Sequence, residues 1–139
     1  MIILDTNVIS EAMASAPDER VARWIRFASQ DDLYTTAITE AEMRYGAARL
    51  PEGRRKRELE QTVERIFTVR FADRVLPFDS TAARHFPNIL VKMQRDGLTY
   101  SSTDAQIAAI AISNGASIAT RDERGFPRAD IPIINPWNG

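Results

Sequence analysis

The sequence predicts an α/β protein in three layers: a mostly parallel central sheet with helices on both faces. Strand-like apolar segments alternate with segments whose apolar residues recur at helical spacing, as in parallel strands joined by helical crossovers. The first segment, Ile2–Leu4, is apolar at every position, which is typical of a strand buried on both faces. A chain of 139 residues suits one compact domain, so we expect a single domain over residues 1–139.

The composition excludes several kinds of site. The chain has no cysteine, and therefore no disulfide, thiol nucleophile or thiolate zinc site. Its one histidine, His85, excludes a multi-histidine metal site. The net charge of −1 gives no overall basic field for nucleic acid, although a local basic patch can serve a neutral protein. No apolar run approaches the roughly 20 residues that span a bilayer, and we expect a cytoplasmic protein.

A polar turn follows the first strand. Asp5 ends the strand, where it suits either a ligand site or a simple cap for the helix that follows. Thr6 and Asn7 carry short oxygen-bearing side chains that suit a turn or a helix N-cap. The elements expected next are a short helix at about 7–13, a helix at 18–28, a turn at 30–32 and a strand at 33–38.

Two helices separated by Pro51–Gly53 follow the second strand. The first begins at Thr39, and we expect the pair, about 39–67, to project from the sheet as a helical hairpin. A third strand is expected at 75–79, where Pro77 favours the sheet edge because it has no N–H to donate.

The last part of the chain continues the alternation. A long helix is expected at 80–96, ended by Gly97, although Pro87 can kink it. The most apolar helix follows at 103–114 and stops at Gly115. Loops at 98–102 and 121–127, strands at 117–120 and 131–134, and a tail at 135–139 complete the expected elements.

Four acidic residues, far apart in the sequence, are expected at one edge of this sheet. In a parallel α/β sheet, the carboxyl ends of the strands and the amino ends of the following helices lie on the same edge. Asp5 and Asp122 follow strands. Glu42 and Asp104 are expected in the first turns of helices. Asp104 also precedes apolar residues by three and four positions, which places it on the buried side of its helix.

Each acid also has a purely structural interpretation. Thr39 precedes Glu42 by the three residues of a capping box, and helix dipoles favour acids in the first turn. Ser101 precedes Asp104 in the same way. Asp122 suits a turn. Capping alone, however, does not require Asp104 to face the core.

Several carboxylates that lie within a few ångströms of one another cannot all be ionised without a counter-charge. Either some of them stay protonated or a cation binds between them. An all-oxygen set suits Mg²⁺ or Mn²⁺, ions that keep water ligands and take phosphate oxygens as further ligands. The chemistry expected is metal-assisted hydrolysis of a phosphodiester by an activated water molecule. Thr6, Asn7 and Thr120 are expected to orient water or to hold a carboxylate.

Four motifs resemble those of PIN-domain ribonucleases. They are Asp5-Thr-Asn7 after an apolar strand, Ile38-Thr-x-x-Glu42-x-x-x-Gly46, the helix start Asp104-Ala-x-Ile107-Ala108, and Ala119-Thr-Arg-Asp122. With Asn135-Pro136-Trp137, they resemble the toxins of VapBC-type toxin–antitoxin pairs, in the FitB-like branch, over essentially the whole chain. The resemblance implies a PIN-like fold, Mg²⁺- or Mn²⁺-dependent RNA cleavage, a homodimer, and inhibition by a small antitoxin that binds operator DNA. The acids implied are Asp5, Glu42, Asp104 and Asp122.

One motif departs from the pattern of that family. Many relatives have Asn after the Thr-Arg pair and an acid directly before the Phe. This chain has Asp122 at the first position and Gly125, before Phe126, at the second. Glu123 is therefore an alternative fourth acid.

A basic run stands at the start of the second hairpin helix. Arg54, Arg55, Lys56 and Arg57 are candidate contacts for an RNA backbone. Glu58 and Glu60 follow closely and dilute the positive charge, and such runs more often form a solvated helix face.

Two other functions fit an acid at the end of the first strand. A PIN-like fold can serve as a catalytically silent binding module, although intact acids argue against this. An aspartate-based phosphotransfer protein can use Asp5 as its phosphoacceptor. A dehalogenase-type phosphatase would have a second Asp where this chain has Asn7, and a receiver domain would have a Lys that residues 131–139 lack.

Overall fold

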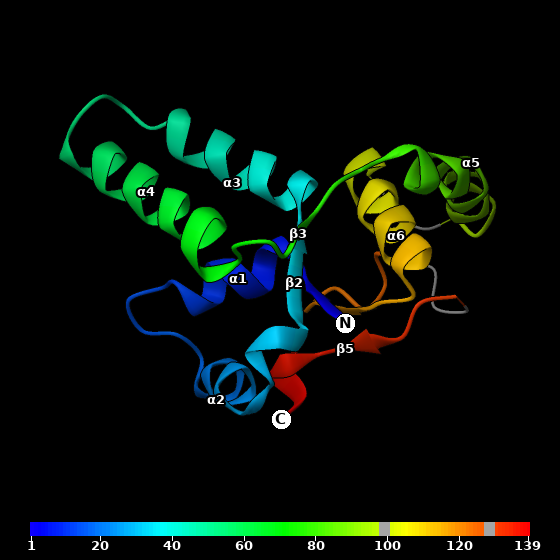
Figure 1. The fold of residues 1–139 in the computed structure, drawn as a ribbon, viewed down its shortest axis with the longest axis horizontal. Coiled ribbons are helices and arrows are strands. Elements are labelled where there is room, and N and C mark those ends of the chain that lie inside the picture. Colours follow the sequence, from blue (N-terminus) through cyan, green and yellow to red (C-terminus); the bar gives the residue numbers. More distant parts are fainter. Residues whose placement is uncertain (98–100, 127–129) are drawn as a thin grey trace.

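The strands of the structure form one parallel sheet with the first strand at its centre (Figure 1). The structure is a computed structural model and describes residues 1–97, 101–126 and 130–139. The strands are β1 (Ile2–Leu4), β2 (Leu33–Thr36), β3 (Val75–Leu76), β4 (Ser117–Ala119) and β5 (Ile133–Ile134). Their order in the sheet is β3-β2-β1-β4-β5, and all neighbouring strands are parallel. The prediction that the third strand lies at the edge is confirmed.

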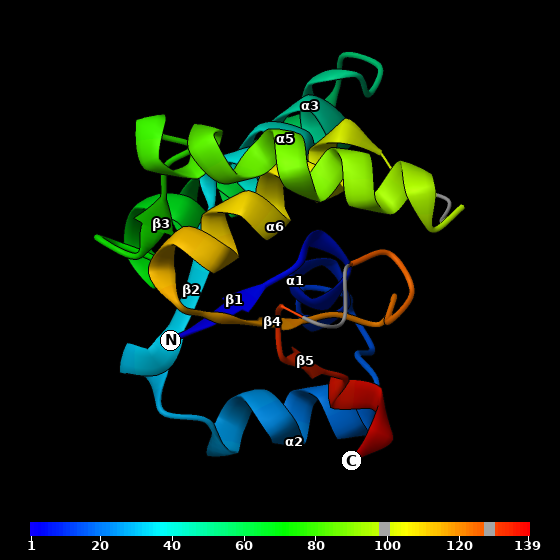
Figure 2. The ribbon, with the colours of Figure 1, turned by 90° about the vertical axis from the view of Figure 1, so that its right-hand side faces the viewer.

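Helices cover both faces of this sheet, as predicted. They are α1 (Thr6–Ala12), α2 (Glu19–Phe27), α3 (Ala37–Ala48), α4 (Arg54–Arg65), α5 (Ser80–Arg95) and α6 (Ser102–Asn114). Figure 2 shows α5 and α6 on one side of the central strands and α2 on the other. The arrangement has three layers.

The alternating side chains of β1 and β4 explain why both faces are covered. Ile3 and Ile118 belong to one apolar core, together with side chains of α5 and α6. Leu4 and Ala119 belong to a second core, together with side chains of α1 to α4. Complete burial of a large aliphatic side chain contributes about 1.5–3 kcal/mol. A strand that is apolar at every position is therefore stabilised only between two layers of helices.

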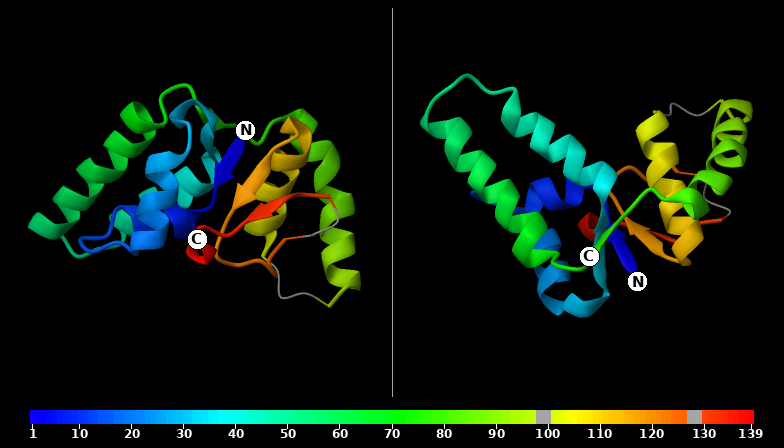
Figure 3. Two further views of the ribbon diagram at one scale, coloured as in Figure 1. Left: turned by 90° about the horizontal axis from the view of Figure 1, so that it is seen from below. Right: turned by 45° about the horizontal axis from the view of Figure 1, so that its top comes forward.

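Helices α3 and α4 lie side by side and extend beyond the sheet, which confirms the predicted helical hairpin (Figure 1, Figure 3). Arg44 Nη1 of α3 forms an ion pair with Glu64 Oε2 of α4 at 2.6 Å. Met43, Ala47 and Val63 belong to the same apolar core beneath this pair. Residues Ile66–Arg70 then continue α4 as a wider π-helical turn, so the helix expected to end at about residue 67 runs on to Arg70.

The sequence-based boundary between the second strand and its helix is wrong. The Thr36 hydroxyl accepts a hydrogen bond from Thr39 N at 3.1 Å, so Thr36 caps α3, which begins at Ala37. The strand therefore ends at Thr36 instead of residue 38, and Thr39 is not the helix cap. Consequently Glu42 lies in the second helical turn, and its expected capping box is absent.

Other boundaries differ by a few residues. The strand expected at 75–79 is limited to Val75–Leu76, and that at 131–134 to Ile133–Ile134. Pro87 lies inside α5 without ending the helix. Leu98–Tyr100, in one predicted loop, and Pro127, in the other, lie outside the described residues. The described helices include none that is long and apolar enough to cross a membrane.

Candidate active site

Asp5 is held at the carboxyl end of the central strand, where α1 begins. Its Oδ1 accepts a hydrogen bond from Thr6 N at 2.8 Å and thereby caps the helix. Its Oδ2 accepts one from Thr120 Oγ1 at 2.9 Å. Only 7% of Asp5 is exposed. Asp5 is therefore both a helix cap and a buried carboxylate at the predicted edge, two interpretations that the sequence left open.

Thr120 connects the ends of β1 and β4. Its buried hydroxyl donates to Asp5 and accepts hydrogen bonds from Asn7 Nδ2 at 3.2 Å and Asp122 N at 3.0 Å. These groups meet because the two strands pair in parallel and end at the same level of the sheet. The structure thus brings Asn7 and Thr120 against Asp5.

Glu42 reaches the same edge from α3. Thr6 Oγ1 lies 3.2 Å from Glu42 Oε1 and 3.2 Å from Thr39 Oγ1. A threonine hydroxyl has one proton, and an ionised carboxylate only accepts, so Thr6 donates to the ionised form of Glu42. Thr39 is fully buried behind this contact. Its part in holding Thr6 was missed because Thr39-x-x-Glu42 has the spacing of a helix cap.

Asp104 stands in the first turn of α6. Ser101 Oγ accepts a hydrogen bond from Asp104 N at 3.1 Å, which confirms the predicted cap. The helix brings Asp104 close enough for its charge to act on Asp5 and on Glu42. Ser101 therefore caps α6, and Asp104 belongs to the acidic cluster.

Asp122 joins the cluster from the loop after β4. Its Oδ1 accepts hydrogen bonds from Arg124 N at 3.2 Å and Gly125 N at 3.0 Å, which is the turn that the sequence allowed. A Cβ atom on residue 125 would lie 2.6 Å from Asp122 Oδ2, closer than real contacts of this kind. Gly125 is thus required for the Asp122 carboxylate to keep its place. Only the departure from the family motif signalled this position in the sequence.

Burial and mutual repulsion raise the pKa of three of these acids. Burial is the largest cause for Asp5, whose pKa rises to about 6, and the charges of Asp104 and Glu42 add to it. The hydrogen bonds to the Asp5 oxygens act in the opposite direction. Burial, and then repulsion from Asp104, raises the pKa of Glu42. Burial, and then repulsion from Asp122, raises that of Asp104. The four predicted acids form one electrostatic cluster.

Known proteins resemble this chain over almost its whole length. The family profile described as the PIN domain matches residues 2–132. The chain belongs to the PIN domain family.

This PIN domain is 43% identical to the plasmid stability protein StbB of Pseudomonas syringae pv. tomato over 137 residues, 99% of each chain. It is 40% identical to the toxin FitB of Neisseria gonorrhoeae over 138 residues, again 99% of each chain. The crystal structure of FitAcB from Neisseria gonorrhoeae matches it with a TM-score of 0.91 at 40% identity, covering 100% of both chains. The PIN domain is therefore of the VapC and FitB type, as its motifs predicted.

The acids of this PIN domain supply only oxygen donors, the ligands that Mg²⁺ and Mn²⁺ prefer. Within residues 1–97, 101–126 and 130–139, no group of three or more acidic or histidine side chains is placed to hold a metal ion. The chemistry of the donor set still fits a divalent cation. A positive charge there would relieve the repulsion that raises the pKa values of Asp5, Glu42 and Asp104.

The two alternatives for the fourth acid lie in different surroundings. Asp122 acts electrostatically on Asp104. Glu123 lines a surface hollow together with Ile131–Ile133. Asp122 is therefore linked electrostatically to the acidic cluster of this PIN domain.

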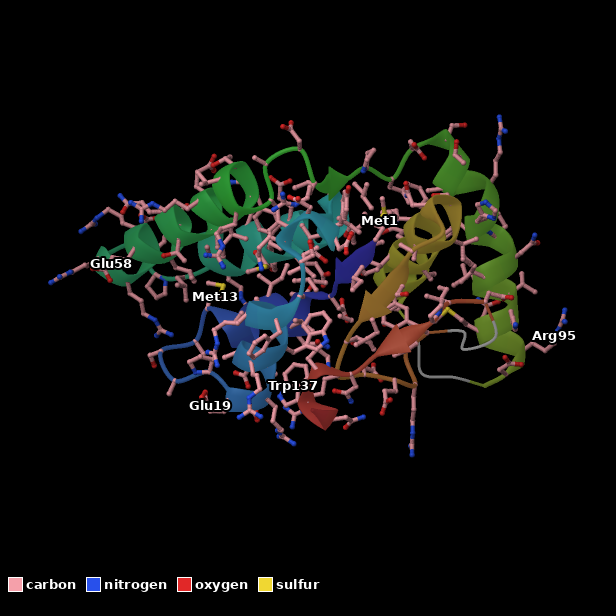
Figure 4. All side chains as sticks on the ribbon, turned by 60° about the horizontal axis from the view of Figure 1, so that its bottom comes forward. Met1, Met13, Glu19, Glu58, Arg95 and Trp137 are labelled. Atoms are coloured by element: carbon pink, nitrogen blue, oxygen red, sulfur yellow. The ribbon has the colours of Figure 1, made fainter. Side chains whose placement is uncertain are left out.

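The basic run lies apart from the acids. It begins α4 at the outer end of the helical pair, beside Glu58 (Figure 4). Arg54 Nε pairs with Glu58 Oε1 at 2.8 Å, and Lys56 Nζ pairs with Glu52 Oε1 at 2.5 Å. The other two members, Arg55 and Arg57, are exposed. The PIN fold therefore does not bring this run to the edge where the acids meet.

Proposed function

We propose that this PIN domain is a metal-dependent endoribonuclease and acts in the cytoplasm as the toxin of a type II toxin–antitoxin pair. The observation that carries the proposal is the cluster of four acids at the carboxyl edge of the sheet, with three pKa values raised. The relative from Sinorhizobium fredii named VapC ribonuclease Y4jK, 41% identical over 99% of this chain and 98% of its own length, supports the activity. The similarity to the toxin FitB supports the biological role.

The proposed metal ligands are Asp5, Glu42, Asp104 and Asp122, and the proposed ion is Mg²⁺ or Mn²⁺. When bound, such an ion supplies an activated water and neutralises negative charge that grows on the phosphate oxygens. Protein groups fix the ligands in place. Thr120 and Thr6 N hold the two oxygens of Asp5, and the Thr6 hydroxyl holds Glu42.

Glu42 is the proposed proton acceptor in the hydrolysis. It is more exposed than Asp5, and the Thr6 hydroxyl holds it at the edge of the site, where a carboxylate oxygen can face the attacking water. The attacking water gives its proton to a Glu42 oxygen as the new O–P bond forms. The bond from phosphorus to the leaving sugar oxygen breaks, and that oxygen takes a proton from solvent.

A small antitoxin that binds operator DNA is the proposed inhibitor of this PIN domain, which is proposed to be a homodimer. The structure of FitAB bound to an IR36 DNA fragment supports the antitoxin. That structure matches this chain with a TM-score of 0.90 at 41% identity, over 99% of this chain and 96% of the other.

RNA cleavage by the purified protein tests the proposal. We expect cleavage with Mg²⁺ or Mn²⁺, none with a chelator, and a large loss for Asp5→Asn, because Asn removes a charge that the cation needs. Asp31→Asn, a change at an exposed aspartate distant in the fold, is the matched control. Equal cleavage by wild type and Asp5→Asn would contradict the site. Absence of both cleavage and Mn²⁺ binding would favour the silent binding module.

A further inference from the structure

A surface hollow of about 390 Å³ adjoins the acidic cluster. Thr6 and Glu42 line one end of it, and side chains of α1, α3 and α4 line the rest. Its floor includes Met13, Met43 and Leu59. The volume lies within the range of about 300–1,000 Å³ that is common for small-ligand sites. The hollow is thus a largely apolar space that begins at two residues of the proposed active site.

Gly46 leaves this space open. It lies inside α3, where glycine is less favourable than alanine. Its φ is not positive, and a Cβ at this position would meet no atom within 4 Å. Neither backbone conformation nor crowding in the described residues therefore explains a glycine here. Gly46 follows Glu42 by one helical turn and lies on the same side of α3, so a side chain at residue 46 would enter the hollow.

We propose that the hollow seats a nucleobase of the RNA, from a nucleotide next to the phosphate that is cleaved. This inference rests on the proposed ribonuclease function. The cleaved phosphate must reach Glu42 and its partners, and the hollow begins at Glu42, so a neighbouring nucleotide lies over it. Gly46 provides the clearance that a flat ring needs above the helix.

The lining of the hollow matches the chemistry of a base. A base has two apolar faces and a polar edge. Met13 and Met43 are flexible and polarisable, and they pack well against flat rings. Ser10, which also lines the hollow and is exposed, presents a hydroxyl for the polar edge. The hollow therefore offers an apolar surface to the faces of a base and a hydroxyl to its polar edge.

The test fills the hollow by Gly46→Leu, a change that also favours the helix. The matched control is Ala48→Leu, on the same helix at an exposed position outside the hollow. Substrates are short oligoribonucleotides that differ only in the base next to the cleaved bond, including one that lacks a base there. Cleavage is measured as kcat and KM, and binding is measured with uncleavable 2′-O-methyl versions of the same oligonucleotides.

We expect Gly46→Leu to weaken binding of the preferred oligonucleotide about tenfold or more and to raise KM, since a stacked base contributes binding of this size. The oligonucleotide without the base should bind wild type and Gly46→Leu equally, and Ala48→Leu should behave as wild type. Circular dichroism and Mn²⁺ affinity equal to wild type would show that the fold and the acids are intact.

Unchanged binding and base preference in Gly46→Leu would overturn the proposal. If, in addition, that variant no longer bound the antitoxin, the hollow would be a protein-binding site instead. A wild-type protein that neither binds nor cleaves RNA would overturn the proposed function together with this inference. Cleavage by wild type with no effect of Gly46→Leu would overturn this inference alone.

Discussion

Asp5 combines a structural role with an unfavourable electrostatic one. It caps α1 and anchors Thr120, yet burial raises its pKa to about 6. An acid with a raised pKa binds more protons in the folded than in the unfolded state between about pH 4 and pH 6. Stability from this group is therefore present below pH 4 and is lost as the pH rises through 6. A rise from 3.8 to about 6 corresponds to about 3 kcal/mol.

Asp5→Asn should accordingly stabilise the metal-free protein at neutral pH. Asn keeps the cap to Thr6 N but leaves the Thr120 hydroxyl without a charged acceptor, which costs about 1 kcal/mol. The expected net effect is a gain of about 2 kcal/mol at pH 7 and a loss of about 1 kcal/mol below pH 4, where Asp5 is protonated in both states. Urea unfolding at the two pH values, with a chelator present, measures it. A gain that does not depend on pH would contradict the electrostatic origin.

Gly125 should be essential for the position of Asp122. In Gly125→Ala the new Cβ would stand 2.6 Å from Asp122 Oδ2, so the carboxylate must move away. Changes that misplace a metal-binding group commonly lower metal affinity 10–100-fold, and we expect a loss of about tenfold for Mn²⁺. Titration calorimetry is the measurement. Gly139→Ala is the control, because its Cβ would make only an ordinary contact of 3.7 Å.

At the residue scale, the sequence predicted where the acidic residues lie better than it predicted which residues contact them. Asp5, Asp104 and Asp122 could be located because strand ends and helix starts share one edge of a parallel sheet. The role of Thr39 could not be predicted, because it depends on a contact with Thr6, 33 residues away. The closeness of Gly125 to the Asp122 carboxylate could not be predicted either, because it depends on the path of one loop.

At the element scale, the errors have a common cause. The β-branched residues Thr35 and Thr36 favour a strand, and local propensity alone continues that strand to Ile38. The Thr36 hydroxyl instead bonds to Thr39 N and starts the helix. The spacing of apolar residues predicted the bounds of the long helices well. The short strands at the sheet edges depend on pairing with strands that are distant in the sequence, which a local pattern does not contain.

The basic run of α4 permits a prediction about RNA contact. Its exposed members Arg55 and Arg57 are the proposed contacts, because Arg54 and Lys56 are already paired with glutamates. Replacing both Arg55 and Arg57 by Ala should make the salt dependence of RNA binding shallower, by about 0.7 per lost contact in the slope of log K against log salt. Replacing Arg54 and Lys56 should change the slope less. Equal slopes for all three proteins would show that the run is only a solvated helix face.

At the scale of the whole molecule, a cation should stabilise the native state. Carboxylates from the end of β1, from α3, from α6 and from the loop after β4 meet only in the folded chain, so an ion held by them favours folding. At 100 times Kd, a ligand of this kind adds about 2.7 kcal/mol. We expect Mn²⁺ to raise the melting temperature of wild type but much less that of Asp104→Asn. The same increase in both proteins would place the ion elsewhere.

The architecture could be predicted as a class, but its arrangement could not. Alternating strands and helices indicate a parallel sheet with two covered faces. The order β3-β2-β1-β4-β5 depends on pairings such as Ile3 with Ile118, which lie far apart in the sequence. The helical pair could be predicted because its two helices follow each other directly in the sequence and are joined by a short connection.

The central place of β1 has a consequence for protein synthesis. Asp5 leaves the ribosome well before Thr120, which holds it, because 115 residues separate the two in the chain. At about 5–20 residues per second, roughly 6–23 s separate Asp5 from Asp122 during translation. Throughout that interval the nascent chain lacks β4, and its acidic cluster is incomplete. The proposed active site is therefore completed only after residue 122 has been translated.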